Sequence, residues 1–393
     1  MPDPKTSWRA VAAMFALNGS LFGIWASRVP AAAERHDLAP GDLGLLLLLM
    51  AGGAIVAFPL AGRLADQIGA AIVTRCLGVG NLMALLAITA APGPITLGAA
   101  LFVFGATHGA MDVAMNTWAS EVERHIGRPV MSSFHAMFSL GTGMGAASGF
   151  VAASLGFGIT LHFIAAGLAV AALTQWLAWI DWTSSRRPQT KSVQIFALPK
   201  GPLFAVGFIA FCASLGEGGM ADWSAIFLVL TTGANDAQAA LGYTVFSIAM
   251  VAMRLMGDKV ILTYGSKIAA RMAGAFATTG SLCAIVFGNY AMSLLGFGLM
   301  GIGYAIIMPL AFSRAANDPD TSPGAAIASV STLGYGGMLL GPPLIGFVAH
   351  LTSIRAAFLI LTFLALLIVL LAGRVFRPTL ARPLKREEVR HQI

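Results

Sequence analysis

The sequence predicts an all-α membrane protein with twelve transmembrane helices in two pseudo-symmetric bundles of six. Three observations predict it: an apolar composition, a series of apolar runs of membrane-spanning length, and positive charge on one side. Of the 393 residues, 57% are hydrophobic and only 10% are charged, and the mean hydropathy is +0.80. Soluble proteins carry about 25% charged residues. The chain therefore has too little polar surface for a water-soluble globule, and we expect neither a large soluble domain nor a nucleic-acid partner.

Apolar runs between charged residues or Gly/Pro breaks mark the expected spans. A bilayer core requires about 20 apolar residues per helix, and twelve runs come close to this length. They are residues 8–29, 42–61, 70–91, 96–119, 131–154, 159–181, 203–229, 238–256, 267–287, 291–313, 325–349 and 354–375. The first run has no cleavage-type ending and leads into further spans, so we interpret it as a retained helix.

Positive charge is distributed unevenly between the two sides of these spans. With the amino terminus inside, all but three of the 24 lysine and arginine residues fall in cytoplasmic segments. The three exceptions are Arg28, Arg35 and Arg355. This bias predicts an even number of crossings, with both termini in the cytoplasm.

The longest polar interruption falls near the middle of the chain and divides it into halves. We expect an N-terminal six-helix bundle over 1–182, a cytoplasmic linker over 183–201, a C-terminal six-helix bundle over 202–376 and a cytoplasmic tail over 377–393. Arg63 and Asp66 follow the second span, and Arg254 and Asp258 follow the eighth. An internal duplication is the simplest account of this repetition.

The loop after the second span carries a recognisable motif. Gly62-Arg63-Leu64-Ala65-Asp66-Gln67-Ile68-Gly69 resembles the G-x-x-x-D-x-x-G loop of the major facilitator superfamily. Three other segments resemble its bacterial branch near the fucose permease, and are similar to inner-membrane permeases that include one for rhizopine, an amino-inositol derivative. These segments are Trp25-Ala26-Ser27-Arg28-Val29-Pro30, Asp112-Val113-Ala114-Met115-Asn116 and Glu217-Gly218-Gly219-Met220-Ala221-Asp222-Trp223. The resemblance implies the major facilitator fold, a central cavity, rocking of one bundle against the other, and a bacterial inner membrane as the location.

The loop motif also has a direct physical interpretation. Asp66 lies between two helices, where its carboxylate can accept backbone N–H bonds and pair with an arginine of a neighbouring helix. Arg63, together with Arg254 and Asp258 in the second half, completes a pseudo-symmetric set. We predict that these four residues form a conformational latch, with ordinary loop solvation as the alternative.

Carboxylates and imidazoles inside the spans are the best functional signal. An acidic residue at a helix centre costs about 2.5–3.5 kcal/mol on insertion scales, so it is rarely idle. His108, Asp112 and Asn116 follow one another at intervals of four on the fourth span, and His135 reaches a similar depth on the fifth. Because a carboxylate and an imidazole in one cavity can share a proton, we predict Asp112, His135 and His108 as proton-coupling residues. A structural hydrogen bond, packing roles for the histidines, or a sodium site at Asp112 and Asn116 are the alternatives.

The seventh span contributes a second acidic region. Glu217 lies near mid-depth, and the glycines that flank it predict a discontinuous helix. Asp222 lies nearer the outer end, where it either joins the cavity or pairs with Arg28 as an outer gate.

The predicted solute site combines these acids with neutral polar and aromatic groups. Its expected residues are Asn18, Trp25, Asn116, Glu217, Asp222, Trp223, Tyr304 and Tyr335. Hydroxyl, amide and aromatic groups suit a polyhydroxylated ring. No lysine or arginine falls clearly at mid-depth, so the predicted cavity disfavours organic anions and favours neutral polyols or amino-polyols.

Other classes of function lack support in the sequence. The three cysteines lie in apolar stretches at no metal-like spacing, and no P-loop or H-E-x-x-H motif occurs. We therefore expect no enzyme activity, cofactor or metal. The favoured function is proton-coupled symport of a small sugar, polyol or amino-polyol by a monomer in the bilayer. A proton-coupled exporter of drugs or metabolites is one alternative, and a nontransporting sensor or lipid-handling protein is another.

Overall fold

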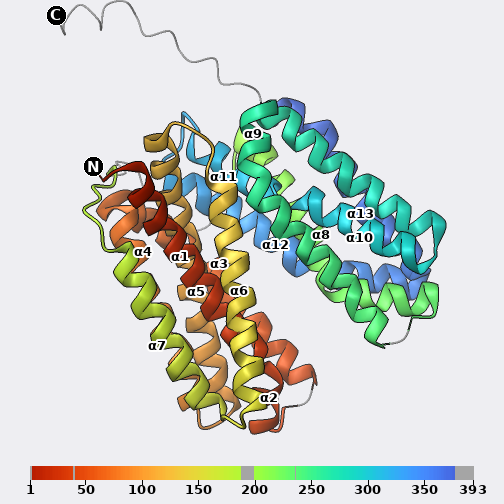
Figure 1. The fold of residues 1–393 in the computed structure, drawn as a ribbon, viewed down its shortest axis with the longest axis horizontal. Coiled ribbons are helices and arrows are strands. Elements are labelled where there is room, and N and C mark those ends of the chain that lie inside the picture. Colours follow the sequence, from red (N-terminus) through yellow and green to blue (C-terminus); the bar gives the residue numbers. More distant parts are fainter. Residues whose placement is uncertain (1, 39, 187–198, 235, 377–393) are drawn as a thin grey trace, which may run out of the picture.

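Two helical bundles make up the protein (Figure 1). The structure, a computed structural model, describes residues 2–38, 40–186, 199–234 and 236–376. Within these ranges every regular element is a helix, which confirms the predicted all-α class. Most of the predicted linker and all of the predicted tail lie outside the described residues, so those two boundaries remain predictions.

The first half contains seven helices, six of which match the first six predicted spans. Their bounds are α1 Pro4–Ser27, α2 Val29–Arg35, α3 Pro40–Ile68, α4 Ala70–Ala90, α5 Pro94–Ile126, α6 Met131–Ser154 and α7 Ile159–Ala178. The short α2 lies in the loop between the first two spans. Helices α1 and α6 pack very closely, because Gly19 and Gly141 each face the backbone of the opposite helix with no room for a Cβ atom.

The second half contains α8 Pro202–Thr232, α9 Asp236–Phe287, α10 Tyr290–Tyr304, α11 Ile307–Ala316, α12 Pro323–Leu351 and α13 Ile354–Val375. Helix α9 holds two of the predicted spans. It turns at Gly265, whose φ of 77° favours glycine, and its second arm runs back along the bundle (Figure 1). Ten other helical segments in the described chain are long and apolar enough to cross a membrane. Together with the two arms of α9 they give the twelve expected spans.

The predicted tenth span is interrupted between α10 and α11. In a continuous helix the N–H of residue 309 would bond the carbonyl of Ala305, but residue 309 is a proline and has no N–H. The Ala305 carbonyl is therefore available to another donor, and the Nε of Arg254 bonds it at 3.2 Å.

The predicted interruption of the seventh span is wrong. Helix α8 runs without a break through Glu217. The flanking glycines provide space for neighbouring side chains instead: Gly216 faces the ring of Tyr304, and Gly219 faces Ile345. Glycine in a membrane helix therefore serves close packing here, which needs no loss of helical hydrogen bonds.

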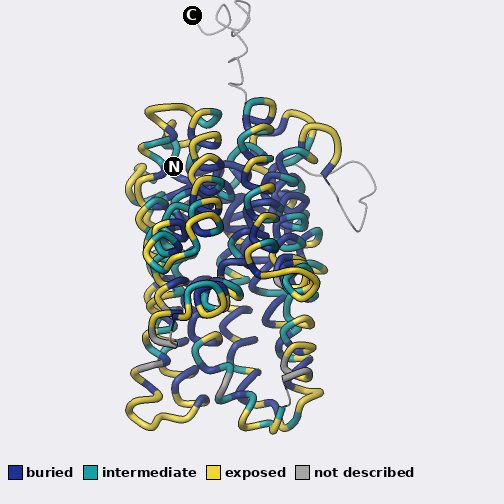
Figure 2. Tube along the Cα trace, turned by 90° about the vertical axis from the view of Figure 1, so that its right-hand side faces the viewer, coloured by how far each residue is buried: buried dark blue, intermediate teal, exposed yellow. Residues whose placement is uncertain are grey.

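The surface of the bundles suits a lipid environment. Figure 2 shows buried positions gathered in the interior and exposed ones along the periphery and at both ends. Large apolar side chains such as Trp176, Val286 and Leu370 are each at least 60% exposed. Apolar exposure on this scale marks a surface that contacts lipid rather than water.

The two bundles meet at one end and diverge toward the other (Figure 1). We call the end that carries the α3–α4 and α5–α6 turns the closed end, and the end that carries α2 and the α8–α9 turn the open end. The halves are linked by backbone contact near the closed end, where Gly62 lies against Gly324. A deeper contact is the T-shaped pair of Phe58 and Tyr335, with ring centroids 4.8 Å apart.

Candidate functional site

Asp66 connects the two halves at the closed end. It sits near the end of α3, is only 3% exposed, and faces the beginning of α12. Its carboxylate accepts the N–H of Gly324 at 3.0 Å, the N–H of Ala325 at 3.3 Å and the hydroxyl of Ser322 at 2.5 Å. These are the unpaired donors of a helix N-terminus, where negative charge is stabilising. The backbone bonds expected of Asp66 therefore join the first half to the second.

Asp258 forms the equivalent contact in the opposite direction. Its two carboxylate oxygens accept the N–H groups of Ser132 at 2.8 Å and Ser133 at 2.9 Å, at the start of α6. The hydroxyl of Ser132 also donates to the carbonyl of Arg254 at 2.8 Å. Each half thus supplies one aspartate to the N-terminus of a helix in the other half. We call the contacts of Asp66 and Asp258, together with those of Glu123 described next, the seam.

Glu123 is a third carboxylate in the seam, and it was not among the residues expected from the sequence. One of its oxygens accepts the N–H groups of Val130 and Met131 at 3.0 and 2.9 Å. The other accepts the hydroxyl of Ser313 in the second half at 2.5 Å. Glu123 lies in the last turn of α5 beside Arg124, so in sequence it resembles a solvated loop charge and gives no distinguishing signal.

Deeper in the first half, a polar chain runs from Asp112 through Asn116 to His135. The side-chain Nδ2 of Asn116 donates to the Asp112 carboxylate at 3.1 Å, and the Oδ1 of Asn116 lies 3.1 Å from the Nε2 of His135. All three residues are buried. In the described part of the chain Asp112 forms no ion pair. The structure therefore brings together three of the four polar residues predicted on the fourth and fifth spans.

His135 faces the second half. Its ring packs against Phe15 of α1 and stacks on Phe312 of α11, with centroids 5.3 and 5.7 Å away. Because Phe312 belongs to the other half, the series of polar contacts from Asp112 through Asn116 to His135 ends at the contact between the halves.

His108 is placed differently from this chain. Its ring lies among Phe22, Phe104 and Phe138, with centroids 5.4 to 6.2 Å away, and its Nδ1 has no hydrogen-bond partner. Asn18 contacts the carbonyl of His108 at 3.5 Å and also accepts a hydrogen bond from Asn81 at 3.2 Å. An aromatic enclosure of this kind suits a neutral imidazole, so the geometry separates His108 from Asp112.

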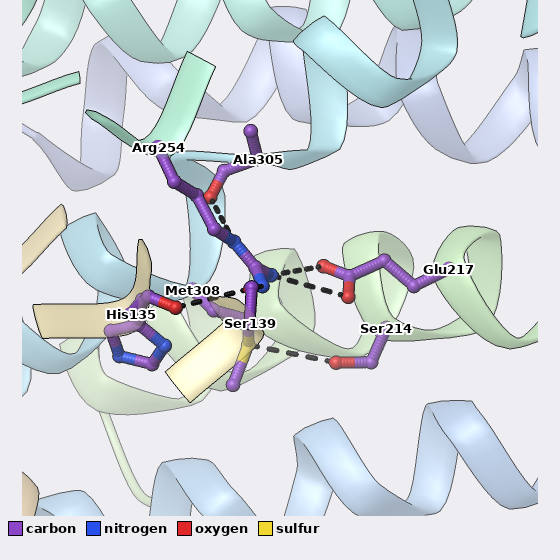
Figure 3. A network of polar contacts seen from close by, with 7 residues as sticks. All are labelled: His135, Ser139, Ser214, Glu217, Arg254, Ala305 and Met308. Atoms are coloured by element: carbon purple, nitrogen blue, oxygen red, sulfur yellow. Dashed lines mark hydrogen bonds and ion pairs between the residues drawn. The ribbon is translucent and has the colours of Figure 1, made fainter. Parts of the chain in front are cut away.

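An ion pair of the second half lies where the two halves meet (Figure 3). The Nη2 of Arg254 lies 3.4 Å from both carboxylate oxygens of Glu217. Its Nη1 donates to the hydroxyl of Ser139 at 2.6 Å, and Ser139 belongs to α6 of the first half. The guanidinium therefore contacts both halves at once.

This ion pair corrects the predicted charge balance. The sequence predicted no cation at mid-depth and placed Arg254 in the latch beside Asp258. The side chain instead extends from α9 toward Glu217, because the freed carbonyl of Ala305 and the Ser139 hydroxyl provide acceptors there. The described site therefore combines one buried guanidinium with the carboxylates. The prediction that the cavity disfavours anions assumed that no cation lies at mid-depth, and this assumption is wrong.

The other predicted solute residues divide by exposure. Asp222 is exposed, and Trp223 and Tyr335 are half-buried. Trp25 and Tyr304 are at most 1% exposed and pack inside their own bundles. In this conformation the second pair can support a site but cannot contact a solute.

The predicted outer gate does not form in this conformation. Arg28 donates to the carbonyl of Phe157 at 2.8 Å, within its own half. Asp222 belongs to the other half, and the two bundles diverge toward the open end (Figure 1). In the described residues, no cluster of three or more His, Cys, Asp or Glu side chains could hold a metal.

Comparisons with known proteins identify relatives over nearly the whole chain. Residues 10–337 match the family model of the Major Facilitator Superfamily. An uncharacterised transporter, y4wD of Sinorhizobium fredii, is 45% identical over 93% of this chain and 97% of its own length. The membrane protein MosC of Rhizobium meliloti is 30% identical over 91% of this chain and 87% of its own.

Among solved structures, a variant of the fucose:proton symporter FucP of E. coli superimposes with a TM-score of 0.76. The match covers 94% of this chain and 98% of that one at 16% identity. This likeness shows a shared fold, and it confirms the twelve-helix architecture expected from the loop motif. The resemblance to the superfamily, expected from the loop motif, is confirmed as well.

Proposed function

This chain belongs to the Major Facilitator Superfamily, and we propose that it is a secondary active transporter that imports a small polar solute together with protons by alternating access. Membership makes it a multi-pass membrane transporter rather than an enzyme. The solute class, the coupling ion and the direction form the proposal.

The proposed orientation places the closed end in the cytoplasm. The positive charge bias supports cytoplasmic termini, and the chain begins at the closed end (Figure 1). The described conformation is then outward-open, with Asp66, Asp258 and Glu123 closing the cytoplasmic side. The proposed location is the bacterial inner membrane, and the proposed transporting unit is a monomer.

One observation carries the coupling proposal: the Asp112 carboxylate is buried, has Asn116 as its hydrogen-bond partner, and forms no ion pair within the described residues. A carboxylate that lacks a permanent cation is costly to keep charged in a membrane, so proton binding relieves that cost. His135, at the far end of the same chain of contacts, is the proposed second proton-handling group. His108 is the weaker candidate because its ring is enclosed by phenylalanines.

The proposed solute is a sugar, polyol or amino-polyol. The fucose:proton symporter FucP shares the fold. Glu217, Asp222, Trp223 and Tyr335 are the proposed contact residues, because each is polar or aromatic and comes from a helix near the junction of the halves. Asn116 is 0% exposed, so its proposed role is to hold Asp112 and His135 in place behind the site. Asn18, Trp25 and Tyr304 are proposed to support the site from behind.

Uptake into proteoliposomes tests this function. The purified protein should accumulate at least one of fucose, myo-inositol and glucosamine above equilibrium when the lumen is made alkaline, and a protonophore should abolish the gradient. Efflux of an apolar amine against its gradient would instead indicate the exporter. A protein that moves no solute in either direction, but still binds one in a thermal-shift assay, would fit the sensor class.

Reporter fusions test the orientation separately. A reporter at Arg187, which lies outside the described residues, should be active in the cytoplasm, and one at Gly233 should be active outside. The reverse result would overturn the outward-open interpretation.

A further inference from the structure

Glu217 is the accessible member of its ion pair. The side chain of Glu217 is 25% exposed, whereas that of Arg254 is 8% exposed. A solute that enters between the halves therefore reaches the carboxylate before the guanidinium.

The contact between the two groups is long for its type. Charge-assisted N–H to carboxylate bonds usually span about 2.7–2.9 Å, but both distances from Arg254 to Glu217 are 3.4 Å. The guanidinium bonds Ser139 more closely, at 2.6 Å, and Ala305 at 3.2 Å. Its position is thus set largely by these two acceptors, and Glu217 retains capacity for a closer donor.

The same geometry disfavours an anion at this place. Each nitrogen of the Arg254 guanidinium already faces an acceptor: Nε faces Ala305, Nη1 faces Ser139 and Nη2 faces Glu217. An anion that bonded a remaining N–H of this group would lie next to the Glu217 carboxylate and be repelled by it. A cation meets no such repulsion, because the partly exposed Glu217 side chain carries the opposite charge.

Arg254 also ties the halves together. Its side chain bonds Ser139, and its backbone carbonyl accepts the hydroxyl of Ser132, both on α6 of the first half. A change in the position of this guanidinium therefore acts on the contact between α6 and α9.

We infer that Glu217 binds an amine group of the solute, and that Arg254 is a resident cation which the amine displaces, so that solute binding loosens the Arg254–Ser139 contact between α9 and α6. This inference rests on the proposed function, and it gives that function a trigger for opening the closed end. A second cation beside the guanidinium repels it strongly where water is scarce, which is what moves Arg254 away from Glu217.

Distance measurements between spin labels test this inference. The labels are attached at Arg128→Cys and Thr263→Cys, two exposed positions on opposite sides of the seam, in a background that lacks Cys76, Cys212 and Cys283. Ethanolamine is the probe, and ethylene glycol is its neutral counterpart. At constant pH and ionic strength, ethanolamine should lengthen the distance in a dose-dependent manner, and ethylene glycol should not.

Variants assign the response to the proposed groups. Glu217→Gln should abolish the response to ethanolamine, and Ser139→Ala should lengthen the distance before any ligand is added. Two matched controls should behave like the wild type: Glu121→Gln, whose carboxylate bonds Trp182 within the first half, and Ser148→Ala, whose hydroxyl bonds His162 within the same half.

An equal effect of ethanolamine and ethylene glycol, or a response that survives Glu217→Gln, would overturn the inference. The readout needs no proton gradient. Normal proton-driven uptake without the amine response would therefore refute this inference alone, whereas an amine response without uptake would refute the proposed function.

Discussion

The two halves repeat the same seam contact but treat charge inside the membrane differently. Asp66 and Asp258 each cap a helix of the opposite half. In the first half, however, the buried carboxylate Asp112 has an amide neighbour, whereas in the second half Glu217 has a guanidinium. The helix-capping contacts that join the halves are therefore duplicated, whereas the surroundings of the buried carboxylates differ between the halves.

Packing explains why the ion pair is not repeated in the first half. Counting back from Glu217 by the 198 residues that separate Gly44 from Gly242 leads to Gly19. At Gly19 the backbone of α6 lies so close that no side chain fits. The first half therefore has a tight α1–α6 contact at the position where the second half has an acid.

Removing the carboxylate of the first half should have the largest effect. Asp112→Asn keeps a similar shape but cannot exchange a proton, so uphill accumulation driven by a pH gradient should disappear, while counterflow exchange persists. Radiolabelled uptake and exchange in the same proteoliposomes measure both. Normal accumulation in this variant would show that coupling lies elsewhere, with the Glu217 pair as the next candidate.

Neutralising the acid of the second half should affect solute choice rather than coupling. Glu217→Gln keeps hydrogen bonding but loses the charge, and a hydrogen bond to a charged group is worth about 1.5–3 kcal/mol. Binding of an amino-polyol should weaken roughly 10- to 100-fold, and its hydroxyl analogue should change far less. Calorimetric titration of both ligands measures the difference, and equal losses would contradict the assignment.

The seam aspartates should have smaller and similar effects. Removal of a helix N-cap costs about 1 kcal/mol, so Asp66→Ala and Asp258→Ala should each shift the balance of conformations roughly fivefold away from the described state. The Arg128 and Thr263 label pair reports this shift. Asp66 has an additional bond to the Ser322 hydroxyl, so the larger change is expected there; no change in either variant would remove the latch role.

The smallest effect is expected at Pro309. Pro309→Ala restores an N–H that can bond the Ala305 carbonyl, which then competes with the Nε of Arg254. One shared hydrogen bond is worth about 0.5–1.5 kcal/mol. The balance of conformations that the label pair reports should therefore shift only a few-fold or less. A shift as large as that of Asp258→Ala would contradict this ranking, because it would mean that the bond from Arg254 to the Ala305 carbonyl stabilises the described state as much as the Asp258 cap does.

The spans and the two seam aspartates, Asp66 and Asp258, could be predicted from the sequence because their signals are local. Apolar runs of sufficient length define helices, and a carboxylate between two helices has a limited choice of partners. The chain from Asp112 to His135 was also predictable, since regular helical spacing and the direction of each span fix relative depth.

The ion pair could not be predicted because it depends on side-chain reach and on a distant proline. Arg254 lies near the predicted end of its span, and only the acceptors created around Ala305 and Ser139 explain why its side chain extends inward. The glycines beside Glu217 were misinterpreted for a related reason: the same residues signal either a broken helix or a close neighbour, and only the positions of Tyr304 and Ile345 distinguish the two.

The seam recognises peptide groups more than side chains. Asp66 binds the N–H groups of residues 324 and 325, and Asp258 binds those of residues 132 and 133. Every amino acid except proline supplies such a group. Residues 324, 325, 132 and 133 can therefore change during evolution without loss of these bonds, whereas the two aspartates cannot. Proline is the exception, because a proline at any of these four positions would remove the N–H that the aspartate binds.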